Sequence, residues 1–183
     1  MVYMGMNVTR TKNLAGYDLP AIDWEPVRDT LASDITQAPD SGGPNRHTAW
    51  LTTINLDGSP HPTPVGFVQL DGVWYFTSGP GTRKSSNIAA DARCVVSVAT
   101  QPFDLVIEGS AARVTDTDEL RSVADEYFRV GWPAKVDGDA LTAEYSAPSA
   151  GPPPWHVYKI TPATVFAFGT AEPYGATRFD LTR

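Results

Sequence analysis

The strongest constraint on the fold is a series of three short apolar runs separated by Asp-Gly pairs. The runs cover residues 49–54, 64–70 and 73–77, and the pairs are Asp57-Gly58 and Asp71-Gly72. Asp-Gly between β-rich runs is typical of a tight hairpin, because such a turn needs positive φ and glycine adopts it readily. The sequence therefore predicts three consecutive antiparallel strands.

A loop of small residues follows the third run and leads into a basic pair. Residues 78–82 precede Arg83-Lys84, residues 85–90 are expected to form a short helix, and a fourth strand is expected over residues 94–100. A basic pair at a helix start can bind an anion, because the side chains, the backbone N–H groups and the helix dipole all favour negative charge there. A solvated helix start explains the pair equally well.

Two nucleotide-binding motifs are excluded at this loop. A P-loop requires glycine immediately before its lysine, where this chain has Arg83, and no parallel βαβ pattern surrounds the loop. No G-x-G-x-x-G follows a predicted strand, so a Rossmann site is not supported. What remains is a simple anion site in which Arg83 offers a planar fork and Lys84 a point charge.

Helices and further strands are predicted around this segment. A proline in the first turn and apolar residues at every fourth position predict a helix from Asp23 to near Ala38. A second helix is expected from the acidic segment 116–119 until just before Gly131. Gly109 suggests a bulge or a close backbone approach. The remaining strands are expected over residues 104–114, 155–161 and 164–169, the last two separated by Pro162.

The whole pattern fits one domain. The chain has 183 residues, of which 42% are hydrophobic, which suits a single packed core. Residues 1–22 are expected to form a loosely packed N-terminal arm, and residues 23–183 one domain with a long irregular loop over 133–154. Six or seven short antiparallel strands with two or three helices predict a mainly β (α+β) fold, a closed or nearly closed barrel.

Composition and charge exclude several function classes. The net charge of −7 argues against nucleic-acid binding, which needs a basic face. No apolar run approaches the ~20 residues that span a membrane, and no secretory segment is recognised, so a cytoplasmic protein is expected. The three histidines, His47, His61 and His156, lack ligand spacing, so no metal site is expected. The single cysteine, Cys94, is expected to be a buried apolar residue.

Several other side chains leave alternatives open. Glu108 lies in an apolar strand and is expected to face outward. Trp50 and Trp74 lie in predicted strands, where a core or dimer-interface position is favoured. Trp132 and Trp155 flank the long loop, and either core packing or the walls of a site for a flat ligand would explain them. No residue is nominated as a catalytic acid, base or nucleophile.

The order of these motifs resembles the pyridoxamine 5′-phosphate oxidase-like split-barrel proteins. The resemblance covers about residues 24–114 and is carried by the Asp57-Gly58 hairpin, the aromatic strand 74–77, Thr82-Arg83-Lys84, Asn87-Ile88 and the turn 90–93. Residues 175–179 resemble the closing A-T-R segment of the actinobacterial flavin/deazaflavin oxidoreductase branch. The resemblance implies a six-stranded antiparallel split β-barrel of the FMN-binding type, with two or three peripheral helices, that forms a homodimer with cofactor sites at its interface.

The implied function is hydride transfer between FMN or coenzyme F420 and a small organic substrate that the sequence does not identify. Carried over by motif, six residues would bind the cofactor. Arg83 and Lys84 would hold its phosphate, and Thr77 would hydrogen-bond near the ring or ribityl chain. Thr52 and Thr53 would face the isoalloxazine, and Arg178 would approach from the C-terminal segment, in the same chain or its partner.

Two departures from the family pattern narrow this expectation. Phe179-Asp180 replaces the usual tryptophan and basic residue, which weakens the implied contact at that end. The sequence has no second basic cluster for pyridoxal phosphate, so true pyridoxamine phosphate oxidase activity is not expected. The alternatives are a non-enzymatic protein that binds a flavin-like or haem-like ligand, and a ligand-free structural dimer, because one fold supports several functions.

Overall fold

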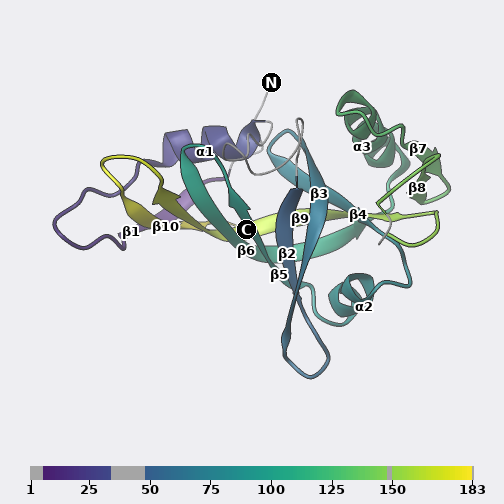
Figure 1. Ribbon diagram of the computed structural model, residues 1–183, viewed down its shortest axis with the longest axis horizontal. Coiled ribbons are helices and arrows are strands. Elements are labelled where there is room, and N and C mark those ends of the chain that lie inside the picture. The colour runs from purple at the N-terminus through teal and green to yellow at the C-terminus, as the bar shows by residue number, and fades with distance from the viewer. Residues whose placement is uncertain (1–5, 34–47, 148–149, 183) are drawn as a thin grey trace.

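The computed structural model describes residues 6–33, 48–147 and 150–182 (Figure 1). In chain order the described elements are β1 (Val8–Asn13), α1 (Trp24–Ala32), β2 (Thr48–Ile54), β3 (Pro60–Leu70), β4 (Val73–Ser78), α2 (Arg83–Ala90), β5 (Arg93–Ala99), β6 (Phe103–Val114), α3 (Thr117–Arg129), β7 (Lys135–Asp137), β8 (Ala140–Thr142), β9 (His156–Gly169) and β10 (Ala176–Leu181).

Six of these strands close into an antiparallel barrel. Its order is β9-β4-β3-β2-β5-β6, and β6 pairs back onto β9. Strand β6 pairs along the whole of one edge of β9, from Phe103↔Gly169 to Val114↔Val157. The other edge of β9 pairs first with β4 and then with β10, which continues the sheet to β1. The predicted mainly β split barrel is therefore confirmed, and β10 and β1 form an extension at the end opposite α2 and α3 (Figure 1).

Strand β9 corrects the prediction of two strands separated by Pro162. Pro162 lies inside one continuous strand, at the point where the partner changes from β4 to β10. A proline lacks the N–H that a continuous ladder needs, and it is tolerated at such a junction or at a bulge. On the other edge, Pro162 faces Gly109 across a register shift, so the expected irregularity at Gly109 is confirmed.

Three further strands lie where the sequence predicted irregular structure. Strand β1 lies within the expected arm and pairs with β10, from Val8↔Leu181 to Asn13↔Thr177. The short hairpin of β7 and β8 lies within the loop predicted over 133–154. Five of the six residues of β1 are exposed, so no alternation of apolar and polar residues marks the strand.

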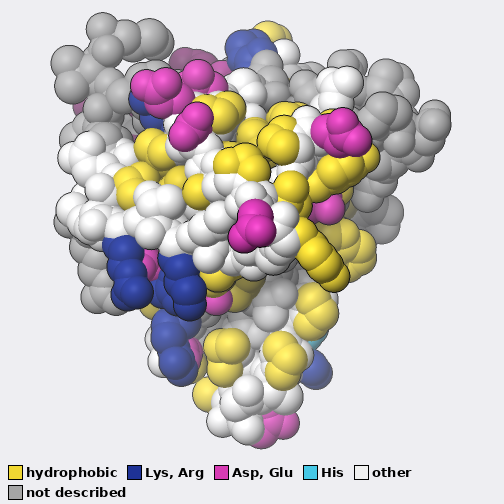
Figure 2. Space-filling model, turned by 90° about the vertical axis from the view of Figure 1, so that its left-hand side faces the viewer, with side chains coloured by type: hydrophobic (Ala, Val, Ile, Leu, Met, Phe, Trp, Pro, Cys, Tyr) yellow, Lys and Arg dark blue, Asp and Glu magenta, His cyan; other side chains and the backbone are white. Residues whose placement is uncertain are grey.

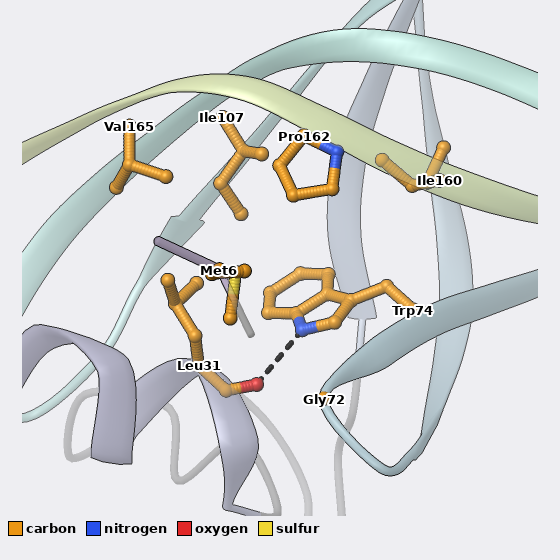
Figure 3. A pocket seen from close by; sticks show the side chains of 8 residues that line it. All are labelled: Met6, Leu31, Gly72, Trp74, Ile107, Ile160, Pro162 and Val165. Atoms are coloured by element: carbon orange, nitrogen blue, oxygen red, sulfur yellow. Dashed lines mark hydrogen bonds between the residues drawn. The ribbon is translucent and has the colours of Figure 1, made fainter. Parts of the chain in front are cut away.

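Helix α1 covers one opening of the barrel. It begins after Asp23 as predicted and ends at Ala32, while the predicted end near Ala38 lies outside the described residues. The buried Trp74 donates its indole N–H to the carbonyl of Leu31 at 2.9 Å (Figure 3). The space left between this helix and the barrel is about 10 Å³, which is no larger than one water needs. This end of the barrel is therefore closed core.

Helix α3 packs on the outside of the barrel. Its residues Leu120, Val123 and Tyr127 form a buried cluster with Tyr75 of β4 and with neighbouring strands. Tyr75 donates to the carboxylate of Glu119 at 2.8 Å. Strand β4 is therefore buried on both faces, with Trp74 and Phe76 turned into the barrel. This packing sets Tyr127 and the loop after α3 beside β3 and β4.

The described structure also settles the lone cysteine and Glu108. Cys94 is buried, and burial raises the pKa of its thiol to about 12, so it stays protonated. Glu108 is exposed on β6, as predicted.

No described helix has the length and apolar character needed to cross a bilayer. Among the described residues, no three His, Cys, Asp or Glu side chains are grouped as metal ligands.

The close approach of β6 and β9 makes Gly109 the most sensitive glycine of the barrel. A Cβ at Gly109 would lie 2.2 Å from the Thr161 carbonyl oxygen, so Gly109→Ala must push two paired strands apart. We expect the free energy of unfolding to fall by about 1–3 kcal/mol in urea denaturation. Gly16→Ala is the matched control, because a Cβ there meets nothing within 4 Å. Equal stability of the two variants would contradict this view of the β6–β9 contact.

Candidate functional site

The candidate site is a pocket of about 290 Å³ between the outer face of the barrel and the chain after α3. The strand side is formed by residues of β3 and the end of β4, and α2 contributes Lys84. The facing wall is largely aromatic. The lining includes Pro64, Gly66, Thr77, Ser78, Lys84, Tyr127, Trp132 and Tyr145.

A cluster of hydroxyl groups fixes the turn from β4 into α2. Thr82 caps the helix, and its side chain accepts a hydrogen bond from the backbone N–H of Ser85. The Thr82 and Ser78 hydroxyls lie 2.7 Å apart, and the Ser85 hydroxyl lies 2.9 Å from that of Ser78. Ser78 and Ser85 are buried. The start of α2, and with it Lys84, is therefore held rigidly against the end of β4.

Lys84 provides the positive charge of the pocket. It is half-buried, and desolvation lowers the pKa of its ammonium group. Within the described part of the chain, no carboxylate forms an ion pair with it. A desolvated cation without a counter-ion favours an anionic ligand, and it lies in the first turn of a helix, where the dipole has the same effect.

Arg83 has a different environment from Lys84. Its side chain is exposed and does not line the pocket. Its charge contributes to lowering the pKa of Asp57 at the tip of the β2–β3 hairpin, although hydrogen bonds from Ser59 are the larger cause. The predicted basic pair is therefore divided, and Lys84 alone faces the pocket.

Thr77 and Tyr127 meet at the inner end of the pocket. The buried Tyr127 donates to the Gly66 carbonyl at 3.4 Å, and burial raises the pKa of its phenol well above the usual value although hydrogen bonding with Thr77 opposes the shift. Tyr127 therefore stays protonated near neutral pH. The described lining contains no His, Cys, Asp or Glu. These side chains can bind and orient a ligand.

The aromatic wall is braced by its own hydrogen bonds. Trp132 donates its indole N–H to the Tyr145 carbonyl at 2.6 Å, and Tyr145 donates its hydroxyl to the Gly131 carbonyl at 3.0 Å. The Trp132 ring lies 4.9 Å from that of Tyr127 and 5.6 Å from that of Trp155. Trp132 therefore lines the pocket, while the buried Trp155 supports it from behind.

The two threonines predicted on β2 lie on opposite faces of the strand. Thr53 is fully buried, and its hydroxyl accepts a hydrogen bond from the Asn87 amide at 3.0 Å. Thr52 lies on the outer face, where it pairs with Pro62 of β3. The next outward-facing residue of β2, Trp50, pairs with Pro64, which lines the pocket. Neither threonine lines the pocket, and a cofactor contact from Thr52 or from the Thr53 backbone stays a prediction.

Arg178 lies on the extension of the sheet and not at the pocket. Its guanidinium binds the Asp180 carboxylate at 2.8 Å and lies over the Phe166 ring. It pairs across the sheet with Lys12 of β1. Lys and Arg side chains gather toward one edge of the face at this end of the molecule (Figure 2). Arg178 does not line the pocket of its own chain, so its contact with a cofactor, in this chain or a partner, stays a prediction.

Sequence reasoning did not assign Tyr127 and Tyr145, which line the pocket, or Asn87, which supports α2 beside it. Asn87 was noted only as part of a motif, yet its buried amide ties α2 to β2 through Thr53 and Asn55. A buried amide in a short helix is the signal that could have found it, because such a group needs partners. Tyr127 lies in the apolar face of α3, and its sequence context gives no sign that it reaches the pocket.

The chain is similar to a known family in sequence and to solved structures in fold. The family model for pyridoxamine 5′-phosphate oxidase matches residues 41–169. Comparison with the curated proteins gives no match. Among solved structures, a conserved hypothetical protein from Mycobacterium tuberculosis is 16% identical with a TM-score of 0.58, over 85% of this chain and 89% of that chain.

Two other solved structures have the same fold. A putative 5-nitroimidazole antibiotic resistance protein from Bacteroides thetaiotaomicron is 14% identical with a TM-score of 0.53, over 99% of this chain and 96% of that chain. A heme binding protein from Mycobacterium smegmatis is 18% identical with a TM-score of 0.52, over 75% of this chain and 53% of that chain. At these identities the likeness shows the fold alone.

Proposed function

The chain belongs to the pyridoxamine 5′-phosphate oxidase family, and we propose that it binds FMN or coenzyme F420 and transfers a hydride between that cofactor and a small organic substrate in the cytoplasm. The observation that carries the proposal is Lys84, which has no ion-pair partner among the described residues and is held in the first turn of α2 at a pocket with aromatic walls. A phosphate suits the lysine end, and a planar ring suits Trp132 and Tyr145.

In this proposal the protein binds and orients, and the cofactor ring supplies the hydride chemistry. Lys84 would hold the phosphate, with N–H groups of the first turn of α2. Thr77 offers a hydroxyl partway along the pocket, and Tyr127 keeps it in place from behind. Because Lys84 is the only cation of the described lining, a second phosphate on the substrate has no partner there, and we do not propose pyridoxamine phosphate oxidation.

FMN and coenzyme F420 are distinguished by titration. The A-T-R segment that resembles deazaflavin enzymes makes contacts within this chain, because Thr177 accepts from the Ile22 N–H at 2.7 Å and Arg178 binds Asp180. The net charge of −7 also disfavours the anionic tail of F420. Fluorescence titration of the cofactor-stripped protein with each compound identifies the cofactor. Binding of neither would contradict the proposal.

Lys84 provides the sharpest test of the phosphate assignment. Replacing Lys84 with alanine should weaken binding of the preferred cofactor by about tenfold or more, because a charge-assisted contact contributes about 1.5–3 kcal/mol. Arg83→Ala should weaken it less, since that side chain is exposed outside the pocket. The exposed Lys135 on β7 offers a matched control, and Lys135→Ala should bind as the wild type does. An unchanged affinity in Lys84→Ala would disprove the assignment.

A non-enzymatic ligand-binding protein is the second candidate. It is favoured by the absence of His, Cys, Asp and Glu from the described lining. The heme binding protein of Mycobacterium smegmatis has the same fold, but among the described residues no His, Cys or Met lines this pocket, and Tyr127 and Tyr145 are the side chains that could ligate iron there. Reduction of the bound ring by a donor, followed by reoxidation with a panel of oxidised organic substrates, separates an enzyme from a carrier.

We propose that the protein is a homodimer joined through the outer face of the barrel. One row of cross-strand neighbours, Trp50, Ser97, Val106 and Phe166, faces outward on β2, β5, β6 and β9. Trp50 is 52% exposed although it lies in the middle of a strand. The pocket of one chain, about 290 Å³, is at the lower limit of small-molecule sites, about 300–1,000 Å³, so a second copy would complete its enclosure.

Trp50 tests the dimer. Trp50→Asp places a charge in the proposed interface, so the protein should elute as a monomer in size-exclusion chromatography with light scattering, where the wild type is dimeric. Leu56→Asp is the control, because Leu56 is 90% exposed in the hairpin turn and should leave the dimer intact. A monomeric wild type, or a dimeric Trp50→Asp variant, would contradict this interface.

A further inference from the structure

A second pocket, of about 490 Å³, opens at the end of the barrel beside α2. Among the residues that the structure describes, the two pockets have no lining residue in common. Its inner part is formed by Ile88, Ala111 and Tyr158, which belong to the core cluster of the barrel. Its rim carries Arg113 from the end of β6 and His156 from the start of β9. The pocket therefore has an apolar interior and a polar entrance.

The polar groups of this entrance retain unused hydrogen-bonding capacity. Arg113 forms an ion pair through one guanidinium nitrogen, with Asp139 at 2.7 Å, and about a third of its side chain is exposed. In the part of the chain that the structure describes, no hydrogen bond engages the His156 imidazole or the Tyr158 hydroxyl. The two rings lie 6.4 Å apart. Arg113, His156 and Tyr158 thus each have a hydrogen-bond donor available for a ligand.

We propose that this barrel-end pocket binds a small aromatic monocarboxylate. The free edge of the Arg113 guanidinium matches a carboxylate, which it can bind in a bidentate manner. Ile88, Ala111 and the Tyr158 ring offer the apolar and aromatic surface that a ring requires. Asp139, the ion-pair partner of Arg113, offsets part of its positive charge, so a single negative charge is accepted more readily than the double charge of a phosphate.

His156 complements this arrangement as a neutral group. Desolvation, followed by the charge of Arg113, lowers the pKa of its imidazole, and the opposing effect of Asp139 is smaller. At pH 7 the ring is therefore uncharged and can donate one N–H to the ligand. Arg113 and Asp139 are the charged side chains that act on it, and they are the groups that the ligand would rearrange.

Benzoate is the probe for this site, titrated into the full-length isotope-labelled protein and followed by amide NMR shifts. We expect saturable shifts confined to residues 111–113 and 156–158. Benzamide, which has the same ring without the charge, should bind about tenfold more weakly. Arg113→Gln should weaken benzoate binding by about tenfold or more, whereas Asp139→Asn should strengthen it because it removes the competing carboxylate. Arg121→Gln, which alters a surface ion pair on α3, is the matched control.

The outcomes separate this pocket from the proposed cofactor site. Lys84→Ala should leave benzoate affinity unchanged, and Arg113→Gln should leave flavin affinity unchanged. The proposal is overturned if folded wild-type protein shows no saturable benzoate shifts, or if Arg113→Gln binds benzoate as the wild type does. Inorganic phosphate binding as tightly as benzoate would also overturn it, since a general anion site would then explain the data. Asp139→Asn keeps the test valid if Arg113→Gln fails to fold.

Discussion

The pairing of strand β9 on both edges is the interaction on which the rest of the structure depends. One edge is occupied throughout by β6, and the other is divided between β4, which closes the barrel, and β10, which carries the sheet outward to β1. Pro162 and Gly109 face each other at the division, where the backbones come too close for a side chain on Gly109. The pairing of β4 with β9 also fixes where the chain leaves β4 and enters α2.

The site follows from that geometry through two further constraints. The hydroxyls of Ser78, Thr82 and Ser85 bind the end of β4 to the start of α2, so Lys84 cannot swing away from the pocket with its loop. Helix α3 packs on the same strand through Tyr75 and brings Tyr127 and Trp132 to the other side. A charged end and an aromatic wall are therefore fixed to one strand, β4, by two different kinds of contact.

Local signals in the sequence were sufficient to predict most strands of the barrel. They were insufficient where pairing with a distant segment determines whether a strand forms or where it ends. The Asp-Gly turns were recognisable because Gly58 and Gly72 adopt positive φ, as a tight hairpin requires. Strand β1 was missed because it is stabilised by pairing with β10 and has no apolar face of its own. Strand β10 does alternate, with Thr177, Phe179 and Leu181 buried, but the polar residues between them and its short length hid this pattern. Pro162 predicts a break between two strands, because a sequence does not show that one strand changes partners at a proline.

The candidate site was predictable on the strand side and, as one of two alternatives, at Trp132. The motif around Arg83-Lys84 located the anion site, but which of the two side chains enters the pocket depends on how α2 packs against the barrel. Adjacent residues on a strand point to opposite faces, so Thr52 and Thr53 could not both face one ligand through their side chains. The aromatic wall comes from residues 127–145, and Trp132 was one of the two tryptophans for which a flat-ligand site was an open alternative. Nothing in the sequence placed it, with Tyr127 and Tyr145, opposite Lys84.

The central claim, that Lys84 at the start of α2 is a phosphate site serving a flavin-type ring, is tested most directly by comparing FMN with riboflavin. The two share the ring and the ribityl chain and differ only in the phosphate. Equilibrium binding to the cofactor-stripped protein should favour FMN by about tenfold or more, the contribution of a charge-assisted contact. Equal affinities would contradict the phosphate site and leave the pocket without the ligand that its charge implies.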